Sequence, residues 1–255
     1  MNKIQYFYFS PTSTTKKVLE GIVKGTGYES VEHNLTMIAK NLDEYVVEKD
    51  EIAIVGVPVY AGRVPEVILD TLKRIKGNGG VAIAVVTYGN RAFDDALLEL
   101  KDILKGQNFN VIAGGAFIGE HSYTKKVATN RPDESDMEKA EYFGKKIVAK
   151  LEEKDFNEII VPGKFPYKER KPKSIFAPHG NRSCVYCRHC PVACPVGAID
   201  MRKPDIVDEE KCIHCCACIK VCTFNGRELL DEGVLGKIKW LEENCQERKE
   251  PQIFI

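Results

Sequence analysis

The sequence lacks several features that would indicate common classes of function. Lys plus Arg and Asp plus Glu each number 37, so the formal net charge is zero. Without an excess of basic residues, no nucleic acid and no anionic membrane is expected as a partner. No apolar run approaches the length of a membrane span. The first residues, MNKIQYFYFSPTSTT, are typical of a strand followed by hydroxyl side chains and not of a cleavable signal, so we expect a cytoplasmic protein.

Two common nucleotide-binding motifs are also missing. The hydroxyl-rich residues 10–15 have neither the lysine and glycines of a P-loop nor the G-x-G-x-x-G of a dinucleotide-binding turn. Residues 77–82 match G-x-G-x-x-A, but this stretch precedes an apolar run instead of following one. We therefore interpret it as a turn.

Cysteine, in contrast, is abundant, and eight of the ten cysteines stand in one repeated pattern. The spacing C-x2-C-x2-C-x3-C occurs twice. It is typical of bacterial proteins with two [4Fe-4S] clusters, in which the fourth cysteine of each motif binds the other cluster. Three thiolates on one loop reach three irons of one cube, and the fourth reaches the second cube. We therefore assign one cluster to Cys184, Cys187, Cys190 and Cys222, and the other to Cys212, Cys215, Cys218 and Cys194.

Two alternatives use the same residue type. Paired C-x2-C units also bind structural zinc, but a zinc site needs four ligands, and two zinc sites would leave the third cysteine of each motif unexplained. A disulfide framework belongs to an oxidising compartment, which the expected cytoplasmic location does not provide. We favour the clusters.

Residues 181–226 resemble the bacterial two-cluster [4Fe-4S] ferredoxins. Thr223 stands where that family usually has proline, a change that is expected to loosen the turn near Cys222. An additional cysteine, Cys216, lies between two assigned ligands. It is either a packed thiol close to a cluster or an exchangeable ligand.

The preceding residues alternate between apolar runs of strand length and amphipathic helical patterns. Near-continuous apolar strands indicate a doubly wound parallel sheet covered by helices on both faces. We expect helices after residue 15, over residues 37–46, from Pro65, from Asp94 and Asp95, and from a capping box of Ser135 and Glu138. The five expected strands are residues 4–9, 28–35, 51–57, 80–86 and 109–118.

The loop after the first strand is rich in hydroxyl groups. Ligands of parallel sheets bind at the carboxyl ends of the strands, and the loops after the first, third and fourth strands end on that edge. Backbone N–H groups at a helix N-terminus, together with hydroxyls, hold a phosphate without a neighbouring cation. The alternative is a Ser/Thr N-cap without a ligand. The candidate phosphate-binding residues are Ser10, Thr12, Ser13, Thr14 and Thr15.

Residues 1–154 resemble the flavodoxins, because residues 10–15 look like their phosphate loop and the order of elements fits. The resemblance implies FMN, with the other two loops beside its isoalloxazine ring. Tyr60 and Tyr88 are candidate stacking rings, unless either packs on the sheet edge. Arg63 and Arg91 depart from the acidic flavin surroundings of typical flavodoxins; each either favours the reduced anionic flavin or is a solvated surface arginine. The implied ring-contacting residues are Pro58, Val59, Tyr60, Ala61, Gly62, Arg63, Thr87, Tyr88, Gly89, Asn90 and Arg91.

Three further segments complete the chain. The polar loop of residues 119–134 contains His121, Ser122 and Tyr123, which are candidate contacts of the flavin or of a substrate. His121 is alternatively an exposed side chain. Residues 155–180 are a proline-containing basic linker, which either docks an acidic partner or is solvated. Residues 227–255 are expected to be a helical extension.

Fused together, the two halves resemble a flavodoxin–ferredoxin family of anaerobic bacteria and archaea. This resemblance implies an electron-transfer iron–sulfur flavoprotein that links two [4Fe-4S] clusters and FMN to a redox partner protein such as ferredoxin or an oxidoreductase, with no catalytic acid or base. The alternatives are an FMN-dependent reductase of a small molecule or an NAD(P)H:acceptor oxidoreductase, and a non-redox binding module. Eight intact ligand positions argue against the binding module. The sequence leaves undecided whether the chain forms a homodimer.

Overall fold

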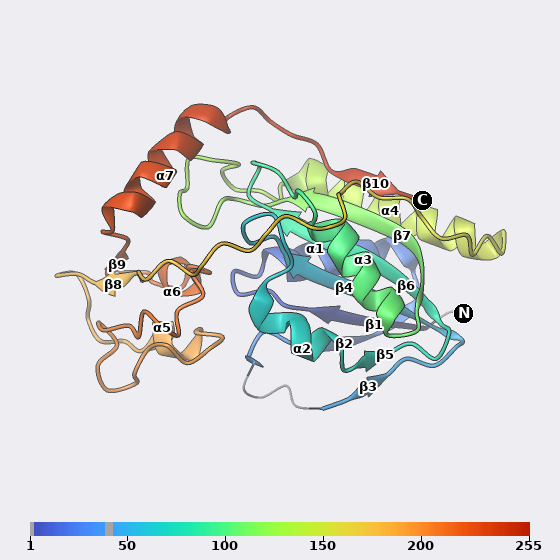
Figure 1. Cartoon of the computed structure of the whole chain (residues 1–255), viewed down its shortest axis with the longest axis horizontal. Coiled ribbons are helices and arrows are strands. Elements are labelled where there is room, and N and C mark those ends of the chain that lie inside the picture. Colours follow the sequence, from blue (N-terminus) through green and yellow to red (C-terminus); the bar gives the residue numbers. More distant parts are fainter. Residues whose placement is uncertain (1–2, 39–42) are drawn as a thin grey trace.

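A six-stranded sheet forms the centre of the larger of two lobes (Figure 1). The structure is a computed structural model that describes residues 3–38 and 43–255. The strands lie in the order β10-β7-β6-β4-β1-β2. Taken in chain order, the five parallel strands have the 2-1-3-4-5 arrangement of flavodoxin-like doubly wound sheets. They are β1 (Lys3–Tyr8), β2 (Glu29–Asn34), β4 (Glu51–Pro58), β6 (Val81–Tyr88) and β7 (Asn110–Ile118).

The sixth strand corrects the prediction of a five-stranded, wholly parallel sheet. Strand β10 (Gln252–Phe254) pairs antiparallel with β7 at the sheet edge. Three residues are too few to show an alternating pattern, so the sequence did not indicate this strand. The C-terminal extension is therefore a helix followed by a strand of the larger lobe.

Helices cover both faces of the sheet. Helices α1 (Thr14–Thr26) and α4 (Glu134–Glu152) pack on one face, and α3 (Ala96–Gly106) packs on the other. The backbones of α1 and α4 approach closely, since a Cβ added to Gly144 would lie 2.2 Å from the carbonyl oxygen of Ile22. Glycine is therefore required at this crossing. Among the described residues, no helix is long and apolar enough to cross a membrane.

Several helix predictions were wrong in extent. The helix expected from Pro65 is a short 3-10 turn, η2 (Glu66–Ile68), followed by α2 (Leu69–Leu72). Chain that was expected to be helical instead forms a parallel pair of β3 (Tyr45–Val46) and β5 (Ile75–Lys76). The rest of the helix predicted over residues 37–46 lies partly outside the described residues.

Two helix starts also differ from prediction. Asp94 has φ 43°, in the left-handed region, and Asp95 is the residue before α3, so neither lies in its first turn. The capping box of α4 is formed by Asp133 and Asp136, whose carboxylates accept from each other's backbone N–H groups at 3.1 and 2.9 Å. Ser135 and Glu138 have the same spacing, but an equally good capping residue stands two positions earlier.

The basic linker lies along α3. The Lys168 backbone N–H donates to Asp95 at 2.7 Å, and Arg170 pairs with Glu99 at 2.8 Å. The Tyr167 hydroxyl donates to Asp102 at 2.6 Å. Acidic residues of the same chain therefore neutralise part of the positive charge of the linker, which was expected to face an acidic partner or solvent.

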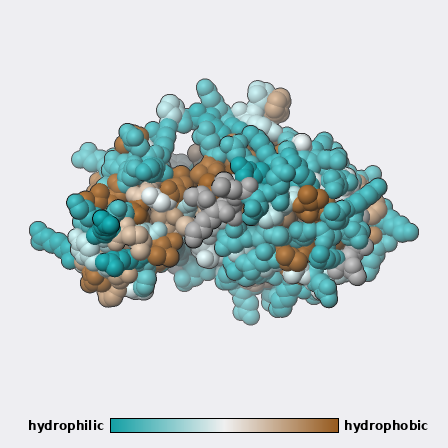
Figure 2. Space-filling model, turned by 90° about the horizontal axis from the view of Figure 1, so that it is seen from below, coloured by the Kyte–Doolittle hydropathy of each residue, from teal (hydrophilic) through white to brown (hydrophobic). Residues whose placement is uncertain are grey.

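The smaller lobe, which we call the cysteine module, contains both cysteine motifs (Figure 1). Its strands β8 (His179–Gly180) and β9 (Arg227–Glu228) pair antiparallel, so it extends slightly beyond the predicted 181–226 at both ends. Its helices are α5 (His189–Val192) and α6 (Ala217–Lys220), and α7 (Glu232–Asn244) follows. Figure 2 shows hydrophobic residues gathered on the surface of this lobe, at the left.

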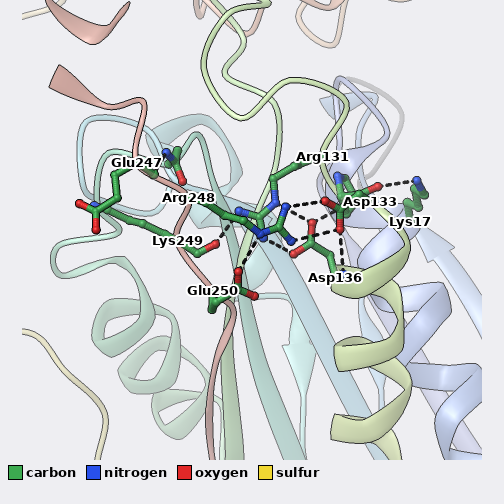
Figure 3. Close-up of polar contacts among 10 residues, drawn as sticks. Lys17, Arg131, Asp133, Asp136, Glu247, Arg248, Lys249 and Glu250 are labelled. Carbon is green, nitrogen blue, oxygen red and sulfur yellow. Dashed lines mark hydrogen bonds and ion pairs between the residues drawn. The ribbon is translucent and has the colours of Figure 1, made fainter. Parts of the chain in front are cut away.

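After α7 the chain returns to the larger lobe as residues 245–254, which we call the return segment. Arg131 forms a buried ion pair with Asp136, with Nε 2.7 Å from Oδ2, and also donates to the Lys249 carbonyl at 2.5 Å (Figure 3). Arg248 donates to Asp133 at 2.7 Å. The module is thus attached to the larger lobe at both of its ends.

Candidate functional site

The eight motif cysteines line two separate hollows in the cysteine module. One, which we call the outer hollow, is lined by Cys184, Cys187, Cys190 and Cys222. The other, the inner hollow, is lined by Cys194, Cys212, Cys215 and Cys218, with Cys216 in the same wall. The structure therefore brings together the same two sets of four thiols that the sequence spacing grouped.

The two motifs fold as an internal repeat. Each residue of the first motif corresponds to one 28 positions later, as Cys184 and Cys212 show. Tyr186 and Arg188 have left-handed backbones with φ 55° and 67°, and their counterparts His214 and Cys216 both have φ 58°. Alternation of right- and left-handed residues turns successive N–H groups inward, which is how backbone binds anionic phosphates and iron–sulfur clusters.

Backbone N–H groups also donate to cysteine sulfurs at equivalent places. The Ala198 N–H lies 3.2 Å from Sγ of Cys194, and its counterpart Gly226 lies 3.1 Å from Sγ of Cys222. A Cβ on Gly226 would lie 2.9 Å from the Cα of Cys184, so the chain needs glycine there. The donor set and its hydrogen bonds fit thiolates that hold a cluster.

The two hollows differ in exposure. All four cysteines of the inner hollow are buried, whereas Cys187 of the outer hollow is exposed and Cys184 and Cys222 are half-buried. Burial raises the pKa of the Cys215 and Cys218 thiols to about 12. Such thiols lose their protons at neutral pH only when a cation binds them.

The inner hollow lies against the carboxyl edge of the large sheet. The Ile38 N–H donates to the Pro195 carbonyl at 3.2 Å, and Ile213 packs against the larger lobe's core. Burial, and to a smaller extent the neighbouring Cys215 and Cys216, raises the pKa of Tyr60 well above the usual range. The loop that was predicted to contact a flavin is therefore next to the inner cysteines.

Tyr123 extends this contact from the polar loop after β7. Its ring stands edge-on to Phe176, with centroids 6.4 Å apart, and both pack with Cys216. The structure thus places Cys216 as a packed thiol of the junction. Sequence reasoning named Tyr123 as a possible flavin contact but missed its position at the module, since Phe176 lies 53 residues away in sequence.

The loop before α1 has the features of an anion site. Ser13 is exposed and has φ 62°, and α1 has no acidic residue in its first turn. Within the described residues, the backbone N–H groups of Thr12, Thr14 and Thr15 donate to no protein acceptor. Ser10 orders the loop by accepting from the Lys16 N–H at 3.1 Å. The loop therefore offers unpaired N–H groups and a helix N-terminus to an anion.

Some predicted contact residues have other partners. The Thr15 hydroxyl is buried and hydrogen-bonds Thr87 at 2.6 Å, so both join α1 to β6. Arg63 forms a two-point ion pair with Glu99, with both N–O distances 2.8 Å, and its guanidinium lies 4.8 Å from the Tyr167 ring. Arg63 is therefore not a free surface cation, and its contact with a flavin stays a prediction.

The loop after β4 is a tight two-residue turn that presents Tyr60. Tyr60 and Arg63 exchange backbone hydrogen bonds at 3.0 Å, with Ala61 and Gly62 at positive φ. Pro58 and Val59 are half-buried, and Val59 is hydrogen-bonded through its N–H to Thr87. This turn holds the Tyr60 side chain between the two lobes.

The loop after β6 is fixed by the return segment. Tyr88 is 5% exposed and stands edge-on to Phe93, so it packs inside instead of offering a stacking face. The Asn90 side-chain amide donates to the carbonyls of Cys245 and Glu247, both at 2.8 Å. Arg91 pairs with Asp94. Residues of this loop were predicted from the flavodoxin resemblance, whereas its bonds to the return segment had no sequence signal.

His121 lies beside that loop. A Cβ on Gly89 would lie 2.5 Å from its ring, and its Nδ1 accepts from the Tyr123 N–H at 3.2 Å. Burial, helped by the charge of Arg91, lowers the His121 pKa to about 4. His121 is therefore neutral at pH 7 and is packed, not merely exposed.

No family model matches the chain, and no curated protein matches it. A flavodoxin from the domain Archaea is 15% identical, with TM-score 0.39, over 59% of this chain and 99% of that chain. A Fusobacterium nucleatum flavodoxin bound to flavin mononucleotide is 19% identical, with TM-score 0.41, over 60% and 99%. Rubredoxin oxygen:oxidoreductase from the anaerobe Desulfovibrio gigas is 18% identical, with TM-score 0.44, over 60% of this chain and 37% of its own.

Proposed function

We propose that this chain is an electron-transfer protein that holds a [4Fe-4S] cluster in each hollow and FMN at the carboxyl edge of the sheet. The observation that carries the proposal is the meeting of eight motif cysteines, four around each hollow, with the inner set against that edge. Such clusters exchange single electrons, and a flavin exchanges one or two.

The arrangement of the sulfurs favours clusters over zinc. A zinc ion needs four ligands about 2.0–2.3 Å from one point. In the described ranges, no group of three or more His, Cys, Asp or Glu side chains is placed to hold a single metal ion. Thiols spaced around a hollow are suited to a larger inorganic group whose several irons each take one sulfur.

The residues at the sheet edge fit FMN in part. The phosphate would be held by the backbone N–H groups of Thr12, Thr14 and Thr15 and by the hydroxyls of Thr12, Ser13 and Thr14. The nearby Lys16 and Lys17 pair instead with Glu32 and the Pro132 carbonyl. Among the predicted ring contacts, the best placed are Val59 and Tyr60. Thr15, Arg63 and Tyr88 would support the site without touching the ring.

The order of the sites follows from their places. The outer hollow reaches the surface at Cys187, whereas the inner hollow adjoins Tyr60 and Ile38 of the larger lobe. We therefore propose that a redox partner protein such as ferredoxin meets the outer hollow and that electrons pass by way of the inner hollow to or from the flavin. Attachment at both ends keeps the sites at high effective concentration.

Anaerobic purification followed by iron, sulfide and FMN analysis tests the proposal. Both clusters and one flavin per chain are expected. The oxidised protein is then mixed with reduced ferredoxin, NADH or NADPH while cluster and flavin absorbance are followed. Fast bleaching by ferredoxin supports an electron carrier, whereas fast bleaching by a nicotinamide would make the protein a reductase. Absence of iron and sulfide from the anaerobic protein would refute the proposal.

A further inference from the structure

The outer hollow contains a buried arginine with unused donors. Arg227 lines this hollow and is 5% exposed. Its Nη1 donates to the Pro178 carbonyl at 2.6 Å. Its Nε and Nη2 are buried and have no acceptor anywhere in the described part of the chain. A buried guanidinium with two unpaired nitrogen donors is costly unless an anion completes its surroundings.

The two copies of the internal repeat differ at the position of this arginine. The residue 28 positions before Arg227 is Ile199, which lines the inner hollow. The two stand at the same place in the repeat, five residues after Cys222 and Cys194, next to Gly226 and Ala198. The outer hollow therefore has a cation at the place where the inner hollow has an aliphatic side chain. The charge of Arg227 also reaches Cys212 and Cys218 of the inner set, but its two unpaired donors belong to a side chain that lines the outer hollow.

A second position repeats the same difference. Arg188 lines the outer hollow, and its counterpart Cys216 lines the inner one. Arg188 is exposed, so water and salt screen its charge, whereas Arg227 is enclosed. Of the two arginines, Arg227 is thus the stronger influence on any group in the outer hollow.

An anionic cluster is the group that these donors suit. A cubane held by four thiolates carries net negative charge, and its reduction adds one more negative charge. Net charge and hydrogen bonds to the sulfurs set the potentials of such clusters. A nearby cation with free N–H groups stabilises the more negative state.

We propose that Arg227 raises the reduction potential of the outer cluster above that of the inner cluster. The inference rests on the proposed function, because it requires both clusters. Arg227 acts here as a positioning and tuning residue, and the added electron comes from the external donor. Electrons that enter the module would then reside mainly on the outer cluster.

The test uses the anaerobically purified, iron-loaded protein in a redox titration followed by electron paramagnetic resonance. Two midpoint potentials are expected in the wild type. In Arg227→Ile, which copies the residue of the other repeat, the higher potential should fall. We expect the ratio of reduced outer to reduced inner cluster to drop at least tenfold, equivalent to about 59 mV for one electron. Arg227→Lys keeps the charge and should recover part of the shift.

Two controls separate tuning from structural damage. Ile199→Val, the matched change in the other repeat, should leave both potentials unchanged, and Arg188→Ala should give a smaller shift than Arg227→Ile. If Arg227→Ile does not retain iron, Arg227→Lys and Arg227→Gln decide, with Gln expected to show the larger fall. Full iron content with unchanged potentials in the variants would overturn this inference. A wild type without clusters would instead overturn the proposed function.

Discussion

The two lobes differ in what fills their interiors. In the larger lobe, which we also call the α/β domain, strands β4 and β6 are buried along almost their whole length. Large side chains such as Phe7, Phe117 and Phe143 are fully enclosed there. In the cysteine module, half of the main cluster of buried residues is cysteine, and Tyr186, Val192 and Phe224 are left exposed. One lobe is held by apolar burial, and the other has little apolar material to bury.

This difference predicts different sources of stability. Small domains bury too little apolar surface to be stable alone and usually need disulfides, metals or partners. The module's cysteines are free thiols in the structure, so its stability should come from what the thiols bind. The α/β domain should need no such help.

Iron removal should give the largest difference in behaviour between the two lobes. After anaerobic chelation of the iron-loaded protein, we expect residues 179–229 to lose protection from hydrogen exchange, because their ligand-dependent interior is gone. Strands β4 and β6 should keep theirs. Hydrogen exchange with mass spectrometry measures both regions at once, and equal protection of the module before and after chelation would contradict the comparison.

The reverse experiment weakens only the α/β domain. Phe117 is fully buried, with its ring centroid 6.2 Å from that of Phe143. Phe117→Ala should lower the free energy of unfolding of this domain by about 3–5 kcal/mol, measured by urea denaturation followed by circular dichroism. Iron content should not change. The control Tyr142→Ala, at a side chain 45% exposed, should cost no more than about 0.5 kcal/mol.

A substitution where the larger lobe meets the return segment should have a smaller and more local effect on stability. Arg131→Met leaves the Asp136 carboxylate buried without its partner and removes the donor to the Lys249 carbonyl. We expect a loss of about 3 kcal/mol, with the return segment losing exchange protection before the rest of the sheet. Adding Asp136→Asn to Arg131→Met should recover stability, because no unpaired charge then remains and the amide oxygen can still accept from the Asp133 N–H. If the double variant were as unstable as the single one, an uncompensated charge would not be the cause.

The smallest effect expected is a pH dependence at the junction. His121 has a pKa of about 4 in the folded protein, against 6.5 ordinarily. The unfolded chain therefore binds the proton more tightly, and stability that is full above pH 6.5 is lost as the pH falls toward 4, by on the order of 2 kcal/mol. His121→Gln should flatten the unfolding free energy over this range. An unchanged slope in that variant would assign the acid sensitivity to other groups.

Local patterns predicted more of this molecule than distant contacts did. The spacing of the cysteines indicated which thiols lie together, because three of each four are on one loop. Apolar runs likewise predicted β4, β6, β7 and most of β1, which are nearly uniformly buried, whereas β2 is polar and mostly exposed. Flavodoxin-like order then placed Ser13, Tyr60 and Asn90 near one edge.

What escaped prediction depends on residues far apart in sequence. Arg63 pairs with Glu99, and Asn90 is hydrogen-bonded to residues more than 150 positions away. Strand β10 is recognisable only by its neighbour β7. Arg227 has no local signal either; its significance appears when the repeat is aligned and its unused donors are seen.

The antiparallel strand β10 also sets an order for synthesis. All eight motif cysteines leave the ribosome before residues 252–254, so the edge of β7 stays open until the module has been made in full. An open edge strand is a template for pairing with other chains. A chain that stops within the module would therefore expose the β7 edge, which is prone to association. Pairing of β10 with β7 occurs only in a chain that already contains all eight motif cysteines.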